Sequence, residues 1–133
     1  MPELPEVETV RQGLLPVLEG ATIARIEMRR RDLRFPLPER FQARLAGQRI
    51  VRLERRAKYL VAVLSSGEAL VMHLGMTGRF TISAEGEQVL PGAYVYAAGA
   101  DTRHDHVVFH LSGGQRVTYN DPRRFGFMVM MTE

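Results

Sequence analysis

The start of the chain holds residue types that could carry out covalent chemistry. If Met1 is trimmed, Pro2 presents a free secondary amine, and such an amine can attack a carbonyl-like or acetal carbon to give a charged iminium. Glu3 lies beside it and Glu6 follows one helical turn later, so either carboxyl group could serve as a general acid. Taken alone, proline at position 2 and acidic residues in a first helical turn are both routine. The N-terminus is therefore a candidate nucleophile that needs support from the rest of the chain.

The second candidate for chemistry is the only lysine of the chain, Lys58. It ends a basic block, residues 21–58, that holds twelve basic residues against four acidic ones, whereas the whole chain has a net charge of +3. A block of this density favours a polyanionic partner such as nucleic acid, because cations that neutralise phosphates release condensed counterions. A solvated cationic surface, with Lys58 as an ordinary exposed strand residue, is the alternative on charge alone.

Thiol and metal chemistry find little support in the sequence. The 133 residues contain no cysteine, which excludes a disulfide scaffold, a thiolate nucleophile and any metal site built on sulfur ligands. His104, His106 and His110 would share one face of a straight strand, so a metal site there is conceivable, but only Asp101 and Asp105 accompany them as carboxylates. We therefore expect no metal and no cofactor in this chain.

The elements that must position these groups are mostly short strands. Residues 5–19 and 38–46 show helical spacing of apolar residues, and the predicted strands are 22–28, 49–55, 59–64, 69–74, 79–82, 106–111, 116–119 and 127–131. The segment 84–102, rich in glycine and alanine, is expected to be a surface loop. Short strands separated by glycine-containing turns favour a sandwich or barrel over a parallel sheet. We therefore expect one domain that is mainly β.

Sequence features also bear on where the protein works. No apolar run approaches the roughly 20 residues that cross a bilayer, and the acidic opening differs from a secretory signal. We therefore expect a cytoplasmic protein without a membrane partner. The apolar, strand-like run at residues 127–131 comes almost at the end, which fits either a cut inside a longer protein or an ordinary terminal strand.

Five collinear segments together resemble one protein family. They are MPELPEVETVRQGL at the N-terminus, followed by RRAKYL, HLGMTG, RHDHVVFHL and YNDPRRFGF. In this order and at these spacings they closely resemble the amino-terminal domain of the bacterial formamidopyrimidine-DNA glycosylases, and the likeness covers essentially all 133 residues. The resemblance implies an antiparallel β-sandwich flanked by two α-helices. It also implies an enzyme of base-excision repair that removes oxidised purines and cuts the strand at the resulting abasic site.

The resemblance gives the N-terminal candidates distinct roles. Pro2 would attack the sugar carbon that bears the damaged base and form a Schiff base, and Glu3 would protonate the sugar oxygen. Lys58 would contact the adjacent phosphate and assist the β,δ-elimination. Glu6 stays a nearby candidate acid. If Met1 is retained, however, the nitrogen of Pro2 is an amide with no usable lone pair.

A second set of residues would fill the gap left by an extruded base, because extrusion breaks stacking and leaves a hole in the duplex. The resemblance places Met76, Arg123 and Phe125 in this role. A thioether and a phenyl ring can replace stacking, while a guanidinium can bond the orphaned partner base. Without the resemblance, Met76 and Phe125 could be core residues and Asp121-Pro122 could merely start a turn, although a methionine flanked by glycine and an aromatic residue beside two arginines are unusual in a core.

The remaining expectations concern the partner and the extent of the enzyme. Candidates for phosphate contacts are His73, His104 and Arg124. The partner would be double-stranded DNA that contains an oxidised purine or an abasic site. Full-length relatives continue into a helix–two-turns–helix module and a zinc finger, so residues 1–133 are expected to be the catalytic domain alone, without zinc. We expect a bacterial, nucleoid-associated monomer that binds DNA weakly and excises little base, with some lyase action on preformed abasic sites.

Two other functions stay open. One is that of a sister branch of the same superfamily, the endonuclease-eight-like glycosylases, which prefer oxidised pyrimidines. Leu4 and the separation of Met76 from Arg123 and Phe125 argue against it, because that branch clusters its gap-filling residues in one loop. The other is a noncatalytic DNA-binding fragment, which a retained Met1 would favour.

Overall fold

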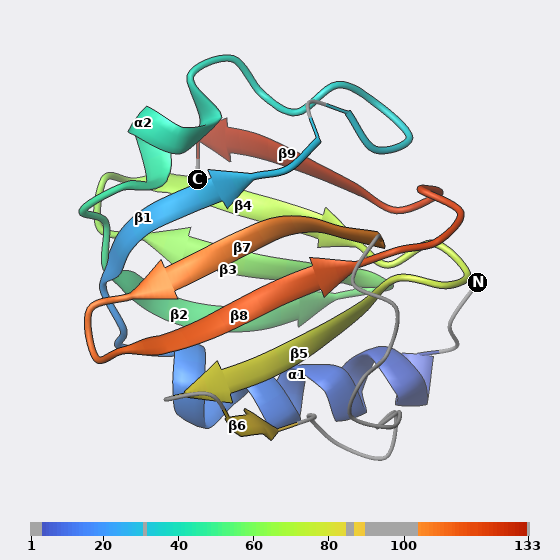
Figure 1. The fold of residues 1–133 in the computed structure, drawn as a ribbon, viewed down its shortest axis with the longest axis horizontal. Coiled ribbons are helices and arrows are strands. Elements are labelled where there is room, and N and C mark those ends of the chain that lie inside the picture. The colour runs from blue at the N-terminus through green and yellow to red at the C-terminus, as the bar shows by residue number, and fades with distance from the viewer. Residues whose placement is uncertain (1–3, 31, 85–86, 90–103, 133) are drawn as a thin grey trace.

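Two antiparallel sheets stack face to face in the computed structural model, which describes residues 4–30, 32–84, 87–89 and 104–132 (Figure 1). The strands are β1 (Ile23–Met28), β2 (Ile50–Arg56), β3 (Tyr59–Leu64), β4 (Glu68–His73), β5 (Arg79–Ala84), β6 (Glu87–Val89), β7 (Asp105–Leu111), β8 (Gln115–Asn120) and β9 (Phe127–Thr132). The five-stranded sheet has the order β1-β7-β8-β5-β6, and the four-stranded sheet has the order β2-β3-β4-β9. With two flanking helices, this confirms the expected mainly β sandwich.

The first helix, α1 (Leu4–Leu18), forms where the apolar spacing predicts it. Its buried residues lie three and four positions apart, and they are Val7, Val10, Leu14 and Leu18. The helix packs on β2 and β3 and lies along the edge of the sandwich in Figure 1. Burial of this stripe joins α1 to the core that fills the space between the sheets.

The second helix, α2 (Phe41–Leu45), is shorter than the predicted 38–46. Arg40 adopts a left-handed backbone with φ 55°, so the helix cannot extend back through it. Phe41 and Leu45, four residues apart, are both buried, as their spacing predicts. Neither helix of the described residues is long and apolar enough to cross a membrane.

The predicted strands are confirmed with shifts of one or two residues at their ends, but one strand was not predicted. β6 lies inside the segment 84–102 that the composition assigns to a loop. The last residue of β5, Ala84, is also the first residue of that segment. β6 pairs with the end of β5 through three residue pairs. A three-residue strand is too short to show alternation, so its backbone pairing left no signal in the sequence. The rest of the predicted loop lies outside the described residues.

Polar contacts fix α1 on the four-stranded sheet. Glu8 accepts hydrogen bonds from Arg11 on its own helix at 2.7 Å and from Arg55 on β2 at 3.0 Å. Arg11 also donates to the carbonyl of Leu53 at 3.1 Å, and Glu19 accepts from the amide of the same residue at 3.0 Å. Hydrogen bonds from Arg11, Gln12 and Arg55 together lower the pKa of Glu8 to about 2. The helix that leads from the N-terminus is thus held at several points along its length.

We predict that Glu8→Gln lowers the melting temperature at neutral pH and flattens its dependence on acid. The pKa of Glu8 in the folded protein lies below the ordinary value of 4.5, so its contribution is complete above pH 4.5 and is lost as the pH falls towards about 2. For a partly exposed ion pair we expect about 0.5–1 kcal/mol, or roughly 2–5 °C. Thermal unfolding followed across this pH range checks the prediction. Glu39→Gln, at an exposed carboxylate, is the control. If the melting temperatures of wild type and Glu8→Gln change with pH in parallel, the prediction is wrong.

Candidate nucleic-acid interface

Most of the predicted functional residues gather at one end of the sandwich. Three connections meet there: the β2–β3 turn (residues 57–58), the β4–β5 loop (residues 74–78) and the β8–β9 loop (residues 121–126). Figure 1 shows them at the end of the molecule where α1 begins. Together with the residue that precedes β7, they carry Lys58, Met76, His104, Arg123, Arg124 and Phe125. We call this end the loop end.

The N-terminal candidates are only partly described. Pro2 and Glu3 lie outside the described residues, so their geometry stays a prediction. Glu6 is half-buried in the first turn of α1, and Lys58 is half-buried in the β2–β3 turn. Ala57, beside the lysine, has φ 52°. The turn that presents Lys58 is tied back to its strand, because Arg55 donates a hydrogen bond to the carbonyl of Ala57 at 3.0 Å.

A buried carboxylate, Asp121, joins the β4–β5 and β8–β9 loops. Its side chain is fully buried. One oxygen accepts hydrogen bonds from the hydroxyl of Tyr119 and the amide of Gly126, both at 2.9 Å. The other accepts from the hydroxyl of Thr77 at 2.6 Å and from the amide of Arg123 at 3.3 Å. Because a buried charge is stable only when its hydrogen bonds are made, this carboxylate fixes the relative position of the two loops.

The backbone of Asp121 extends the network to the start of β7. Its amide donates to the carbonyl of His104 at 3.0 Å, and its carbonyl lies 2.7 Å from Nε2 of the buried His106. The same carbonyl accepts from the amide of Arg124 at 3.3 Å, which closes the predicted turn. Turn formation at Asp121-Pro122 is thus real, but it is only one part of what this residue does.

Glycines let the two loops pack backbone against backbone. Gly75 has φ 64°, and a Cβ placed there would lie 2.6 Å from the amide nitrogen of Gly126. A Cβ at Gly126 would in turn collide with the Tyr119 hydroxyl and the carbonyl of His73. Any side chain at either position would push the loops apart. The glycines of HLGMTG and RRFGF are therefore needed for the close approach.

Met76 and Phe125 project from these tethered loops into solvent. Their side chains are 58% and 48% exposed, so the alternative that they are core residues is wrong. Each loop is held close to its exposed tip, by Thr77 on one side and by Gly126 on the other. The arrangement keeps the backbone fixed while leaving two apolar tips to make contacts with another molecule.

A cationic hollow lies beside Phe125. It has a volume of about 460 Å³ and is lined by Leu33, Arg34, Arg123, Arg124 and Phe125. The amide of Arg34 donates to the carbonyl of Gly126 at 3.0 Å, which holds this segment against the β8–β9 loop. Three arginine residues among the five that line this hollow favour an anion with several acceptor oxygens, such as a phosphate.

His73 is placed beneath the β4–β5 loop rather than at its tip. Its ring is buried and stacks on Phe127, with centroids 5.1 Å apart and planes 4° apart. Burial, together with the positive charges of Lys58 and Arg34, lowers the pKa of His73 below its usual range. Its Nδ1 accepts a hydrogen bond from the amide of Gly75 at 3.0 Å, so in the neutral ring the proton is assigned to Nε2. His73 therefore holds the start of the loop that carries Met76.

The three histidines considered as metal ligands are not brought together as a set. His106 lies against the carbonyl of Asp121, and His110 lies 3.1 Å from a carboxylate oxygen of Glu27. His104 sits ahead of β7, where its carbonyl accepts from the Asp121 amide. Among the described residues, no group of three or more histidine, cysteine, aspartate and glutamate side chains could hold a metal ion.

Sequence reasoning did not find the residues that organise the loop end. The sequence indicates only a turn at Asp121, and it gives Thr77 and Tyr119 no distinguishing feature. The hydrogen bond between Thr77 and Asp121 joins residues 44 positions apart, so no local pattern reports it. The one available signal was the pair of glycine-containing segments, HLGMTG and NDPRRFG, since close backbone approach is a common reason for such glycines.

We predict that Asp121→Asn destabilises the domain and loosens the loop end. An amide group has one acceptor oxygen instead of two, so buried donors such as the Gly126 amide lose their partner, at about 1–3 kcal/mol each. We expect the melting temperature to fall by about 4–10 °C, and exchange of the Gly126 amide hydrogen to accelerate. Asp32→Asn, at an exposed carboxylate, is the matched control. Equal effects of the two substitutions would contradict the role of Asp121.

Comparison with known proteins identifies the family. Residues 1–128 match the family described as "Formamidopyrimidine-DNA glycosylase N-terminal domain". The chain is 67% identical over 133 residues to a formamidopyrimidine-DNA glycosylase of Methylobacterium nodulans, covering 98% of this chain and 45% of the relative. It is 57% identical over 131 residues to the formamidopyrimidine-DNA glycosylase of Sinorhizobium fredii, covering 96% of this chain and 44% of that relative. The chain thus spans less than half the length of the curated relatives it matches.

Solved structures agree with the sequence comparisons. The Lactococcus lactis formamidopyrimidine-DNA glycosylase bound to DNA with an abasic site superposes with a TM-score of 0.78 at 27% identity, covering 98% of this chain and 45% of that one. The same enzyme in complex with DNA that contains FAPY-dG gives a TM-score of 0.77 at 27% identity, covering 98% of this chain and 44% of that one. The fold, the five motifs and these matches agree, and the chain belongs to the formamidopyrimidine-DNA glycosylase family, whose N-terminal domain it carries.

Proposed function

We propose that this domain carries the nucleophile of a bifunctional DNA glycosylase and abasic-site lyase that acts on oxidised purines in duplex DNA. The observation that carries the proposal is the loop end itself. There Asp121 ties together two loops that expose Met76, Arg123 and Phe125, at the end of the sandwich where α1 begins. The Lactococcus lactis relative binds DNA with an abasic site and DNA with FAPY-dG, which supports the same class of partner for this chain.

The covalent chemistry is assigned to the N-terminus. With Met1 removed, the nitrogen of Pro2 attacks C1′ of the damaged nucleotide, and the base leaves with the electrons of the glycosidic bond. The nitrogen gives up its proton, which neutralises the departing base, and Glu3 protonates the ring oxygen, so the sugar opens and the nitrogen is left as an iminium. The iminium acidifies the proton on C2′, and loss of that proton expels the 3′ phosphate. Loss of the C4′ proton from the resulting conjugated iminium then expels the 5′ phosphate. Lys58 contacts the adjacent phosphate and assists these eliminations.

Access to C1′ requires the damaged base to leave the stack, which costs a few kcal/mol. We assign replacement of the lost stacking to the exposed side chains of Met76 and Phe125. Arg123, whose amide is held by Asp121, bonds the orphaned partner base. Because the loops are fixed before DNA arrives, little ordering entropy is lost when these side chains insert.

Phosphate contacts are assigned to Arg124 in the cationic hollow and to His104 beside it in the network. His73 contributes as a neutral ring whose Nδ1 is occupied by the Gly75 amide, which leaves Nε2–H as the group that donates. More than half the length of the curated relatives lies outside the part that this chain matches. We therefore propose that this chain alone retains the lyase step on preformed abasic sites more readily than base excision.

The first prediction is a covalent adduct through Pro2. The chain is incubated with an abasic duplex and borohydride, after intact mass has established that Met1 is removed. Reduction of the iminium should give a stable protein–DNA adduct, because borohydride converts the reversible linkage into an amine. A matched chain with an uncleaved N-terminal extension, in which the Pro2 nitrogen is an amide, should give none. An adduct from the extended chain, or none from the trimmed one, would refute the role of Pro2 and favour a noncatalytic fragment.

The second prediction separates chemistry from binding at Lys58. Lys58→Ala should slow strand scission on the order of 100-fold, as expected for loss of a group that assists proton transfer. DNA affinity should fall only about fivefold, the equivalent of one phosphate contact of roughly 1 kcal/mol. Single-turnover scission and fluorescence anisotropy measure the two effects. Arg56→Ala, at an exposed cation in the same hairpin, is the control and should leave the rate of scission unchanged. Equal losses of scission and affinity in Lys58→Ala would make the lysine a mere phosphate anchor.

A further inference from the structure

Three of the four strands in the four-stranded sheet are apolar on both faces, whereas β2 reads IVRLERR and carries charged residues. β3 reads YLVAVL, β4 reads EALVMH and β9 reads FMVMMT, which are nearly continuous apolar runs. In the five-stranded sheet, by contrast, β1 reads IARIEM and β8 reads QRVTYN, with polar residues interspersed. Continuous apolar runs are typical of strands that are covered on both sides. One face of the four-stranded sheet packs on the core, so the composition of these strands predicts a second cover on the other face.

Strand register arranges the outer face in three rows. The middle row is Val61, Val71 and Val129, and the row beside it is Val63, Ala69 and Met131. The third row is aromatic, because His73 pairs with Phe127 and its ring lies 5.3 Å from that of Tyr59. All three rows cross the sheet from β3 to β9. The outer face is therefore one continuous apolar surface rather than scattered single side chains.

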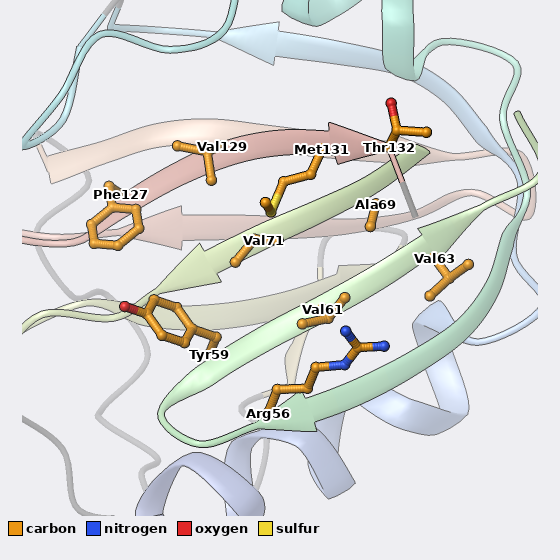
Figure 2. A pocket seen from close by; sticks show the side chains of 10 residues that line it. All are labelled: Arg56, Tyr59, Val61, Val63, Ala69, Val71, Phe127, Val129, Met131 and Thr132. Atoms are coloured by element: carbon orange, nitrogen blue, oxygen red, sulfur yellow. The ribbon is translucent and has the colours of Figure 1, made fainter. Parts of the chain in front are cut away.

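The residues of these rows, with the exception of His73, line a groove of about 460 Å³ (Figure 2). Figure 2 shows the side chains of β3, β4 and β9 on the same side of the sheet, with Arg56 of β2 at one border. Val61, Val63 and Ala69 form a small buried cluster separate from the main core. Towards β9 the surface opens, and Met131 is 56% exposed. A contiguous apolar surface with a charged border is a feature of interaction sites.

We propose that this outer face docks the C-terminal portion found in the full-length relatives, through an apolar segment of that portion. The match to the relatives covers 45% of their length and is a match to an N-terminal domain, so more than half of each relative remains to supply the cover. β9 itself forms one side of the groove, and Met131 and Thr132 line it. A polypeptide that continues from β9 in a relative therefore starts at the border of this surface. Arg56 favours an acidic side chain at the edge of the docked segment.

The position of the groove also connects the docked segment to the loop end. The middle member of the aromatic row is His73, whose Nδ1 accepts from the amide of Gly75 in the loop that carries Met76. Tyr59, at the β3 end of the row, follows the β2–β3 turn that carries Lys58. A segment docked on this face would therefore lie against residues that support the loop end. The proposal itself rests on the sheet and does not depend on the proposed chemistry.

Thiol protection tests the proposal, because the chain has no cysteine of its own. Val71→Cys and Met131→Cys place a thiol in the groove, and Arg116→Cys places one at an exposed position of β8 as the control. Each variant is made in this chain and in a longer chain in which residue 132 is followed by the C-terminal portion of the Methylobacterium nodulans relative. Alkylation by iodoacetamide should be at least about tenfold slower at the groove positions in the longer chain. The rate at Arg116→Cys should be the same in both chains.

Two outcomes would overturn the proposal. Equal alkylation rates in the short and long chains would mean that the C-terminal portion leaves the face uncovered. Protection in the short chain that increases with protein concentration would assign the face to a second copy instead.

Met131→Arg gives a second readout that does not need a thiol. Because Met131 is exposed here, the short chain should keep its melting temperature, whereas the longer chain should lose stability. Neither measurement involves DNA, so failure here leaves the assignment of Pro2 untouched.

Discussion

The loop end depends on a single buried carboxylate and on the donors gathered around it. Asp121 accepts hydrogen bonds from β8, from the β4–β5 loop and from its own loop, and all of its partners are in place before any ligand binds. Separating the loops would leave the carboxylate buried without its donors, which is costly in a low-dielectric interior. The result is a rigid base with exposed tips at Met76 and Phe125. Such a base is suited to inserting side chains into a duplex.

The charge pattern of the loop end follows from the same arrangement. Arginine side chains surround a hollow beside Phe125, while the histidine beneath the neighbouring loop is kept neutral by burial and nearby cations. The arginines thus offer anions a charge that persists at any physiological pH, whereas His73 holds the start of the β4–β5 loop through Nδ1 and offers only a neutral N–H donor. On the four-stranded sheet the pattern is the opposite, because its outer face is apolar almost to its border. The domain therefore presents two surfaces of different chemistry that meet at the aromatic row.

Much of the fold could be predicted from periodicity alone. The spacing of Val7, Val10 and Leu14 predicted α1, and the strands followed from short apolar runs between turns. α2 was predicted too long because the left-handed backbone of Arg40 has no signature in the residue type. β6 was missed because it is three residues long and is held by backbone pairing.

The site was harder to predict than the fold. The neighbours of Met76 and Phe125 in the sequence, a glycine and two arginines, already made them unusual core candidates, but only the family resemblance gave them a role outside the core. Asp121 was missed because its partner Thr77 is distant in sequence, and burial of a charge is a property of the assembled loops. Pro2 and Glu3 lie outside the described residues, so their roles rest on their chemistry and on the resemblance.

The most direct test of this account is the backbone amide spectrum of the ¹⁵N-labelled chain during titration with a duplex that contains an abasic site. Residues of the β2–β3 turn, the β4–β5 loop and the β8–β9 loop should shift, while the valines on the outer face of the four-stranded sheet should not. Shifts centred on those valines, with the loops unaffected, would contradict the assignment of the loop end to DNA.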